Sequence, residues 1–158
     1  MSAPPRRFDH TGLQVLEDDE CLKLLSSVPV GRLVFTKAGL PAIRLVNFFV
    51  DDRTVIFATA DGDKYRAAER EDVVAFEVDE FDPDRHLGWT VTATGRLSVV
   101  DLDDAVRAKP IRAWAPNRDR HLIRLTIEVL EGRRLLAWAQ RPHPATDEQW
   151  PAPGQPLS

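Results

Sequence analysis

The residues best suited to chemistry lie in the stretch Thr59-Ala-Asp-Gly-Asp-Lys64-Tyr65. A strand is expected to end at Thr59 and a helix to begin soon after it, where free backbone N–H groups attract phosphate. Lys64 would lie in the first turn of that helix, where the helix dipole disfavours a cation. An anion held between Lys64, the Thr59 hydroxyl and these amides would remove the penalty. The alternative, which the local sequence favours, is that Asp61 and Asp63 cap the helix while Lys64 is solvated.

A second stretch, Pro41-Ala-Ile-Arg44-Leu-Val-Asn47-Phe48, is typical of an apolar strand interrupted by two polar residues. Because side chains alternate along a strand, Arg44 and Asn47 fall on opposite faces. A central strand seldom tolerates unpaired polar groups, so each needs a partner, either a ligand or an internal ion pair. Trp89 opens another strand and is better explained by core or interface packing than by contact with a ligand.

Motifs for nucleophilic catalysis and metal binding are missing from the sequence. The histidines are scattered and there is one cysteine, so the ligand spacing of a zinc site is not found. No G-x-S-x-G elbow and no phosphate-binding loop occurs. The carboxylates Asp79, Glu80, Asp82 and Asp84 match no calcium loop and are better explained as a solvated turn. We therefore assign no catalytic side chain and no metal, and we expect any reaction to use a borrowed cofactor.

Composition and charge limit the classes of partner. The chain has 158 residues and a formal net charge of -4, which gives no electrostatic reason to bind nucleic acid or an anionic membrane. Hydrophobic and charged residues make up 43% and 29%, as in ordinary globular domains. One cysteine cannot form an internal disulfide, and no apolar run approaches the length of a membrane helix. We expect a single-domain protein of the cytoplasm.

Alternation with period two predicts that most elements are strands. In Trp89–Val99 the residues Trp89, Val91, Ala93, Leu97 and Val99 share one face, while threonines, Arg96 and Ser98 occupy the other. The other expected strands are Gly31–Thr36, Ala42–Val50, Thr54–Ala60, Val73–Asp79, His121–Leu130 and Leu135–Ala139. Ala38-Gly39 and Asp51-Asp52 supply turn residues between consecutive strands, as an antiparallel meander requires.

Helices are expected to be few: Glu17–Val28, Gly62–Arg70 and about Leu102–Trp114. Strands without a β-α rhythm predict a mainly β fold, an antiparallel barrel or curled sheet with peripheral helices. Residues 13–140 would form this domain. Residues 1–12 would be a flexible N-terminal arm, and the Pro-rich residues 141–158 a flexible or extended tail.

Taken in order, these stretches resemble the flavin-binding split-barrel superfamily, the proteins similar to pyridoxamine 5'-phosphate oxidase. The resemblance runs from about Glu20 to Leu135. The segments that carry it are Ser27-Val-Pro-Val-Gly-Arg-Leu-Val34, Pro41–Phe48, Ile56-Phe-Ala-Thr-Ala60, Gly62-Asp-Lys64, Val74–Asp79 and Gly88–Arg96. Their order and spacing are more specific than any one of them, and they imply an antiparallel split barrel that binds flavin mononucleotide (FMN).

The resemblance further implies a homodimer with two FMN sites at the subunit interface. At each site the residues Arg44, Leu45, Val46 and Asn47 would line the edge of the isoalloxazine ring. Thr59 and Lys64 would hold the phosphate, with Ala60 beside them, and Trp89 would reach the site from the partner subunit. We expect the face of Trp89, Val91, Ala93, Leu97 and Val99, with Phe48 and Phe49, to supply the apolar interface.

The expected function is that of a flavin oxidoreductase acting on a small molecule, with the protein supplying positioning and hydrogen bonds around the ring. Two alternatives stay open. Ala58 stands where many relatives carry Arg or His, and this change would fit a deazaflavin cofactor whose phosphate is placed differently. The other alternative is a non-catalytic module that binds flavin or senses a ligand.

Overall fold

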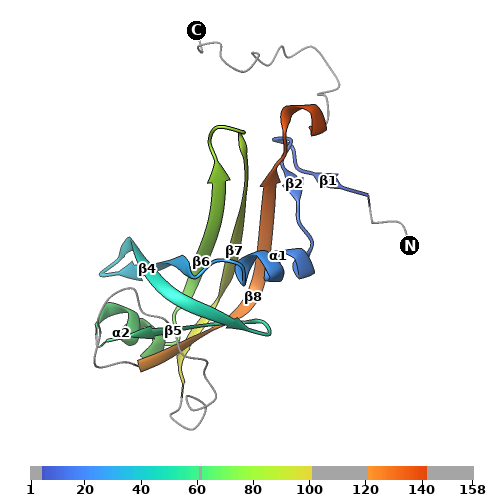
Figure 1. The fold of residues 1–158 in the computed structure, drawn as a ribbon. Coiled ribbons are helices and arrows are strands. Elements are labelled where there is room, and N and C mark those ends of the chain that lie inside the picture. The colour runs from blue at the N-terminus through green and yellow to red at the C-terminus, as the bar shows by residue number, and fades with distance from the viewer. Residues whose placement is uncertain (1–4, 61, 101–120, 142–158) are drawn as a thin grey trace.

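The structure, a computed structural model, describes residues 5–60, 62–100 and 121–141. Within these residues the chain forms one antiparallel sheet with two α-helices beside it (Figure 1). The strands are β1 (Arg7–Phe8), β2 (Gln14–Val15), β3 (Val30–Lys37), β4 (Leu40–Asp51), β5 (Thr54–Thr59), β6 (Val73–Asp82), β7 (Leu87–Val99) and β8 (His121–Leu135). The helices are α1 (Asp18–Leu25), α2 (Asp63–Glu69) and the 3-10 turn η1 (Trp138–Gln140). The expected mainly β fold is confirmed.

The sheet closes on itself through β8. The described strands follow the order β1-β2-β8-β5-β4-β3-β6-β7, and an additional β7–β8 pairing joins the last strand back to β8. β8 pairs with β5 over His121–Thr126 and with β7 over Ile123–Leu135. Because one long strand serves two neighbours, the curled sheet becomes a barrel, with β1 and β2 attached beside it.

The hairpin turns lie where the sequence predicts them. Ala38 and Gly39, between β3 and β4, have φ values of 49° and 78°. Asp52, between β4 and β5, has a φ of 52°. Positive φ is the conformation that tight hairpin turns require, and glycine and aspartate adopt it more readily than most residues. The β3–β4 and β4–β5 connections are therefore short, and they fix the register of three consecutive strands.

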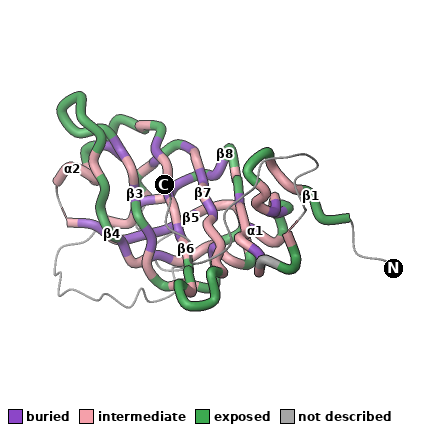
Figure 2. The backbone as a smooth tube through the Cα atoms, turned by 90° about the horizontal axis from the view of Figure 1, so that it is seen from above, coloured by how far each residue is buried: buried purple, intermediate pink, exposed green. Residues whose placement is uncertain are grey.

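The core fills the inside of the barrel (Figure 2). Its largest fully buried side chains include Phe57 and Phe76, and Val91, Ala93 and Leu97 are also fully buried. The alternation seen in Trp89–Val99 therefore distinguishes the inside of the barrel from the outside. This corrects most of the expected dimer face, because the side chains of Val91, Ala93 and Leu97 of β7 and of Phe48 of β4 are buried in the protomer's own core, whereas Val99 stays exposed.

Another correction concerns the end of the sheet. The sequence predicts separate strands at His121–Leu130 and Leu135–Ala139, whereas β8 runs without a break from His121 to Leu135. The polar run Glu131-Gly-Arg-Arg134 interrupts the apolar pattern, yet its residues pair with Thr92 to Trp89 of β7. Backbone pairing with a long neighbour extends the strand through residues whose side chains carry no hydrophobic signal.

Helix α1 packs against β8 and β7 and is shorter than the expected Glu17–Val28. Cys21 and Leu25 are its buried residues, and Leu22 and Val28 pack against the same core, as the helical spacing predicts. Cys21 lies over β8 at Gly132, where the backbone of the strand leaves room for the sulfur. The close approach of α1 to β8 therefore depends on the missing side chain of Gly132.

The N-terminal residues contribute two strands that the sequence analysis does not predict. β1 lies within residues 1–12, and β2 joins it to the edge of β8. Asp9 accepts hydrogen bonds from the backbone of Thr11 and Leu13 and pairs with Arg133 of β8 at 2.9 Å. These contacts, above all the Thr11 hydroxyl, lower the pKa of Asp9 to about 2. The ion pair ties the β1–β2 hairpin to the barrel.

Some expectations fall outside the described residues: the helix at about Leu102–Trp114, and the Pro-rich tail apart from Arg141. Among the helices in the described part of the chain, none has the length and apolar character needed to cross a membrane.

Substitution of Gly132 tests the contact between α1 and β8. In Gly132→Ala the new methyl group would lie 2.5 Å from Sγ of Cys21 and about 3 Å from Leu16. We expect the variant to lose about 1–3 kcal/mol of unfolding free energy in urea titrations. In the double variant with Cys21→Ala the loss should be smaller than the sum of the single losses, because the sulfur that clashes is gone. Strict additivity would contradict this account of the contact.

Candidate functional site

The predicted site residues Arg44 to Lys64 lie on a continuous stretch that runs through β4, β5 and the start of α2. Arg44–Asn47 pair with β3 along one edge of β4, whereas pairing with β5 begins at Phe48. Within the described residues, β4 and β5 therefore diverge beside Arg44–Asn47, and Thr59 lies at the far end of β5. This divergence is the split in the barrel, and it leaves one backbone edge of β4 without a strand partner.

Lys64 and Arg44 form the positive centre of the region. Lys64 is half-buried, and burial together with the nearby Arg44 guanidinium lowers the pKa of its ammonium. Arg44 is exposed and donates a hydrogen bond to the backbone carbonyl of Ile43 at 2.8 Å. Among the residues that the structure describes, neither cation forms an ion pair. Two neighbouring cations that form no ion pair with the described residues favour the binding of an anion, which supports the ligand interpretation of Lys64 over the solvated one.

The start of α2 differs from the capping expected there. Gly62 is the N-cap residue and provides no side-chain hydrogen bond, while Asp61 lies outside the described residues. Asp63 instead pairs with Lys37 of β3 and Arg66 of α2, each at 2.8 Å. These two hydrogen bonds, the one from Lys37 first, lower the pKa of the Asp63 carboxyl. The expectation that Asp63 caps the helix is wrong, because its carboxylate is engaged by two cations.

Thr59 and Asn47 complete the group of polar residues. Thr59 is buried at the end of β5, and its hydroxyl donates to the backbone carbonyl of Ala60 at 3.1 Å. Asn47 lies on the face of β4 opposite Arg44, as the alternation predicts. Its Oδ1 atom is buried and has no hydrogen-bond partner within the described structure. A buried carbonyl oxygen without a donor costs about 1–3 kcal/mol, so a bound molecule that donated a hydrogen bond to this atom would be stabilised.

Leu45 and Val46 lie between these polar residues on β4. Leu45 is 68% exposed, whereas Val46 is 5% exposed and belongs to the core. A ligand along this edge would therefore meet the Leu45 side chain and the Val46 backbone.

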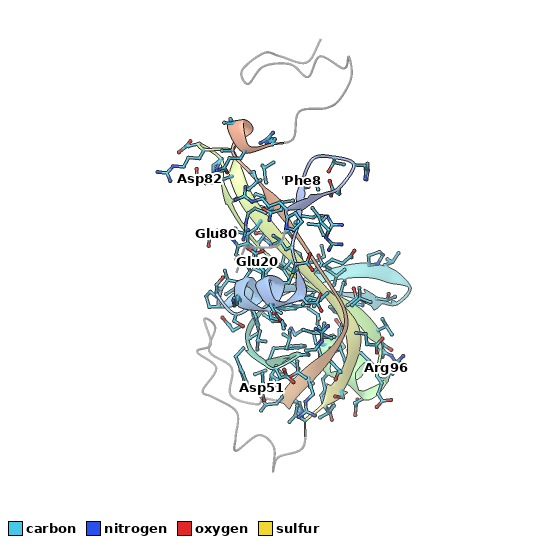
Figure 3. All side chains as sticks on the ribbon, turned by 90° about the vertical axis from the view of Figure 1, so that its right-hand side faces the viewer. Phe8, Glu20, Asp51, Glu80, Asp82 and Arg96 are labelled. Atoms are coloured by element: carbon cyan, nitrogen blue, oxygen red, sulfur yellow. The ribbon has the colours of Figure 1, made fainter. Side chains whose placement is uncertain are left out.

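The structure does not bring Trp89 to the other site residues within one protomer. Thr59 pairs with His121 at the start of β8, whereas Trp89 pairs with Arg134 near its end. These positions are separated by roughly 40 Å of extended strand. Figure 3 shows Glu80, which pairs with Trp89, well apart from Arg96, which lies further along β7. Trp89 is half-buried and packs against the core, so it could join Lys64 only across two subunits.

Lys37 and Arg66 are not among the residues predicted for the site, and the sequence predicts that Asp63 caps the helix. The spacing of Asp63 and Arg66, three residues apart on a helix, is a signal for their ion pair. Lys37 carries no comparable signal, since its approach to α2 depends on how the β3–β4 hairpin folds over the helix. Within the described residues there is no group of three His, Cys, Asp or Glu side chains that could hold a metal ion.

Replacement of Asn47 tests whether its buried oxygen is unsatisfied. Asn47→Leu keeps a similar shape and removes the polar atom, so we expect it to stabilise the ligand-free protein by about 1–2 kcal/mol. Urea denaturation of both proteins, stripped of ligand, measures the change. A decrease in stability would mean that Asn47 makes a hydrogen bond in the free protein.

Comparison with known proteins places the chain in a family. Residues 17–134 match the model of the family described as pyridoxamine 5'-phosphate oxidase. The uncharacterized protein Rv0080 of Mycobacterium tuberculosis is 37% identical over 134 residues, which cover 80% of this chain and 88% of the relative.

Two solved structures show the same fold. An FAD binding protein of Mycobacterium smegmatis has a TM-score of 0.63 and 35% identity, covering 77% of this chain and 99% of the other. An FAD-binding protein of Mesorhizobium loti has a TM-score of 0.66 and 24% identity, covering 78% and 99%. Because the family model spans most of the barrel and a relative exceeds 30% identity, this chain belongs to the pyridoxamine 5'-phosphate oxidase family of split barrels.

Proposed function

We propose that the chain binds a flavin, FMN, with the phosphate between Lys64, Arg44 and Thr59. The observation that carries this proposal is the pair of neighbouring cations Lys64 and Arg44, neither of which forms an ion pair within the described structure. A phosphate monoester carries nearly two negative charges at neutral pH and would neutralise both. The name of the Mycobacterium smegmatis relative, an FAD binding protein, supports a flavin as the ligand.

The ring of the flavin would lie along the free edge of β4. Backbone groups of Arg44–Asn47 face away from β3 there, where pairing with β5 has not yet begun. The Asn47 Oδ1 atom needs a hydrogen-bond donor, and a flavin ring carries an N–H group that can serve. Leu45 and Val46 would supply apolar contact on this edge. The residues present therefore fit a flavin.

A bound flavin would supply two-electron redox chemistry, and we propose that the protein is an oxidoreductase for a small molecule. The chain's own contribution would be to hold the phosphate and to orient the ring. No side chain is assigned a catalytic role. Reduction of the bound flavin by a nicotinamide donor would distinguish this activity from a module that binds flavin without turnover.

We further propose that the protein is a homodimer that shares its sites between subunits. The outward face of the barrel carries exposed apolar side chains, with Ile43 59%, Leu45 68% and Val129 52% exposed. Ile43 and Leu45 lie two residues apart on the same face of β4, and Ile43 pairs with Val34 of β3. A monomer would leave this surface in water, and a second copy would cover it.

Replacing Lys64 tests the phosphate contact. We expect Lys64→Ala to weaken FMN binding about tenfold to a hundredfold, because one charge-assisted contact is lost. Riboflavin, which has no phosphate, should bind both proteins equally. Titration by flavin fluorescence measures both ligands. Equal FMN affinity for the two proteins would exclude the contact, and equal weakening of both ligands would indicate general damage.

A mixed dimer tests whether the site is shared. Lys64→Ala and Trp89→Ala damage different halves of one composite site, so each homodimer should bind FMN weakly. Unfolding and refolding the two variants together should create mixed dimers with one intact site each. We expect tight FMN binding to reappear in the mixture, as measured by titration. Binding no stronger than in the separate variants, or a monomer by light scattering, would exclude a shared interface site.

A further inference from the structure

The Asp63 carboxylate pairs with two cations and directly precedes a third, Lys64. Asp63 directs one oxygen to Nζ of Lys37 and the other to Nη2 of Arg66, each at 2.8 Å. Lys37 ends β3 and Arg66 lies in α2, so the three side chains join the β3–β4 hairpin to the helix. Each oxygen of the Asp63 carboxylate thus forms an ion pair with one cation, Lys37 or Arg66.

The other two cations, Lys64 and Arg44, differ in that they have no carboxylate oxygen within ion-pair distance among the described residues. Arg44 contributes to the lowered pKa of Lys64. Asp63 and Lys64 are the first two residues of α2, so the carboxylate lies close to the lysine on the chain. Its charge acts on Lys64 in the opposite sense to Arg44 and raises the pKa of the lysine. A second anionic group bound on the Asp63 side of the proposed phosphate would meet Asp63 together with Lys37 and Arg66.

We propose that Asp63 is a specificity-determining residue that discriminates flavins with one phosphate from flavins with two. This inference rests on the flavin site proposed above. In a diphosphate the second phosphorus is joined to the first through one oxygen, so it must lie close to the first. Asp63 repels this second phosphate and keeps Lys37 and Arg66 in ion pairs with itself. The second phosphate therefore adds less to the binding affinity. A terminal phosphate held by Lys64 and Arg44 is much less affected.

A simpler role would be to fasten the β3–β4 hairpin to α2 through the Lys37 bridge. The two roles predict different results for substitutions at the two ends of that bridge. If the bridge is a fastener, breaking it from either end changes the affinities for FMN and FAD by the same factor. If Asp63 sets specificity, removing its charge favours FAD, whereas removing the charge of Lys37 disfavours FAD.

The experiment measures dissociation constants of FMN, FAD and riboflavin for the full chain and for Asp63→Asn, Lys37→Met and Glu69→Gln at pH 8. Because FMN and FAD carry similar total charge at this pH, the ratio of their affinities reports where the charge lies. We expect Asp63→Asn to raise the FAD affinity relative to FMN about threefold to tenfold. Lys37→Met should lower the same ratio, and riboflavin should bind unchanged.

Glu69→Gln is the matched control, since it removes one exposed negative charge from the same helix, and its ratio should equal that of the unaltered chain. A ratio that stays constant in both Asp63→Asn and Lys37→Met would overturn the inference while leaving the flavin site intact. Failure of the unaltered chain to bind any of the three flavins would overturn the proposed function together with the inference. If Asp63→Asn does not fold, the ratio in Lys37→Met still decides.

Discussion

The pairing of β8 with two partners is the constraint on which the rest of the structure depends. Residues His121–Thr126 of β8 pair with β5, and residues Ile123–Leu135 pair with β7, so this one strand closes the barrel. This closure fixes the end of β5, and hence Thr59 and the start of α2, at one end of the molecule. It also fixes Trp89 at the other end. Within one closed barrel the two groups stay apart, so a flavin site that includes both Lys64 and Trp89, as proposed above, needs a second copy of the chain.

Electrostatics divides the basic region into two parts. The positive charges of Arg44 and Lys64 repel each other, so a bound anion would stabilise both. The charges of Lys37 and Arg66 are already neutralised in part by Asp63. The positive charge of the region is therefore uneven: it is greater around Arg44 and Lys64 than around Lys37 and Arg66. Both cations near the split come from elements whose positions are set by the barrel, β4 and α2, while Lys37 comes from a hairpin end that extends beyond it.

The sequence predicts the strands well where one face is buried, because period-two alternation reports burial directly, as in Trp89–Val99. It fails at Glu131–Arg134, where backbone pairing maintains β8 through polar residues, and at β1 and β2, which are too short for a periodic signal. In the site, the opposite faces of Arg44 and Asn47 were predictable from spacing. The bridge from Asp63 to Lys37 was not, because it depends on tertiary contact between distant segments.

The position of Cys21 has a chemical consequence. Its sulfur is enclosed between α1, Leu16 and Gly132, and burial raises the pKa of the thiol to about 11. At neutral pH the thiolate, which is the reactive form, is nearly absent and shielded from reagents. Alkylation of this thiol would therefore require α1 to separate from β8. Because the chain has one cysteine, the rate of its alkylation would report how often α1 separates from β8. This measurement would not depend on any signal from the flavin.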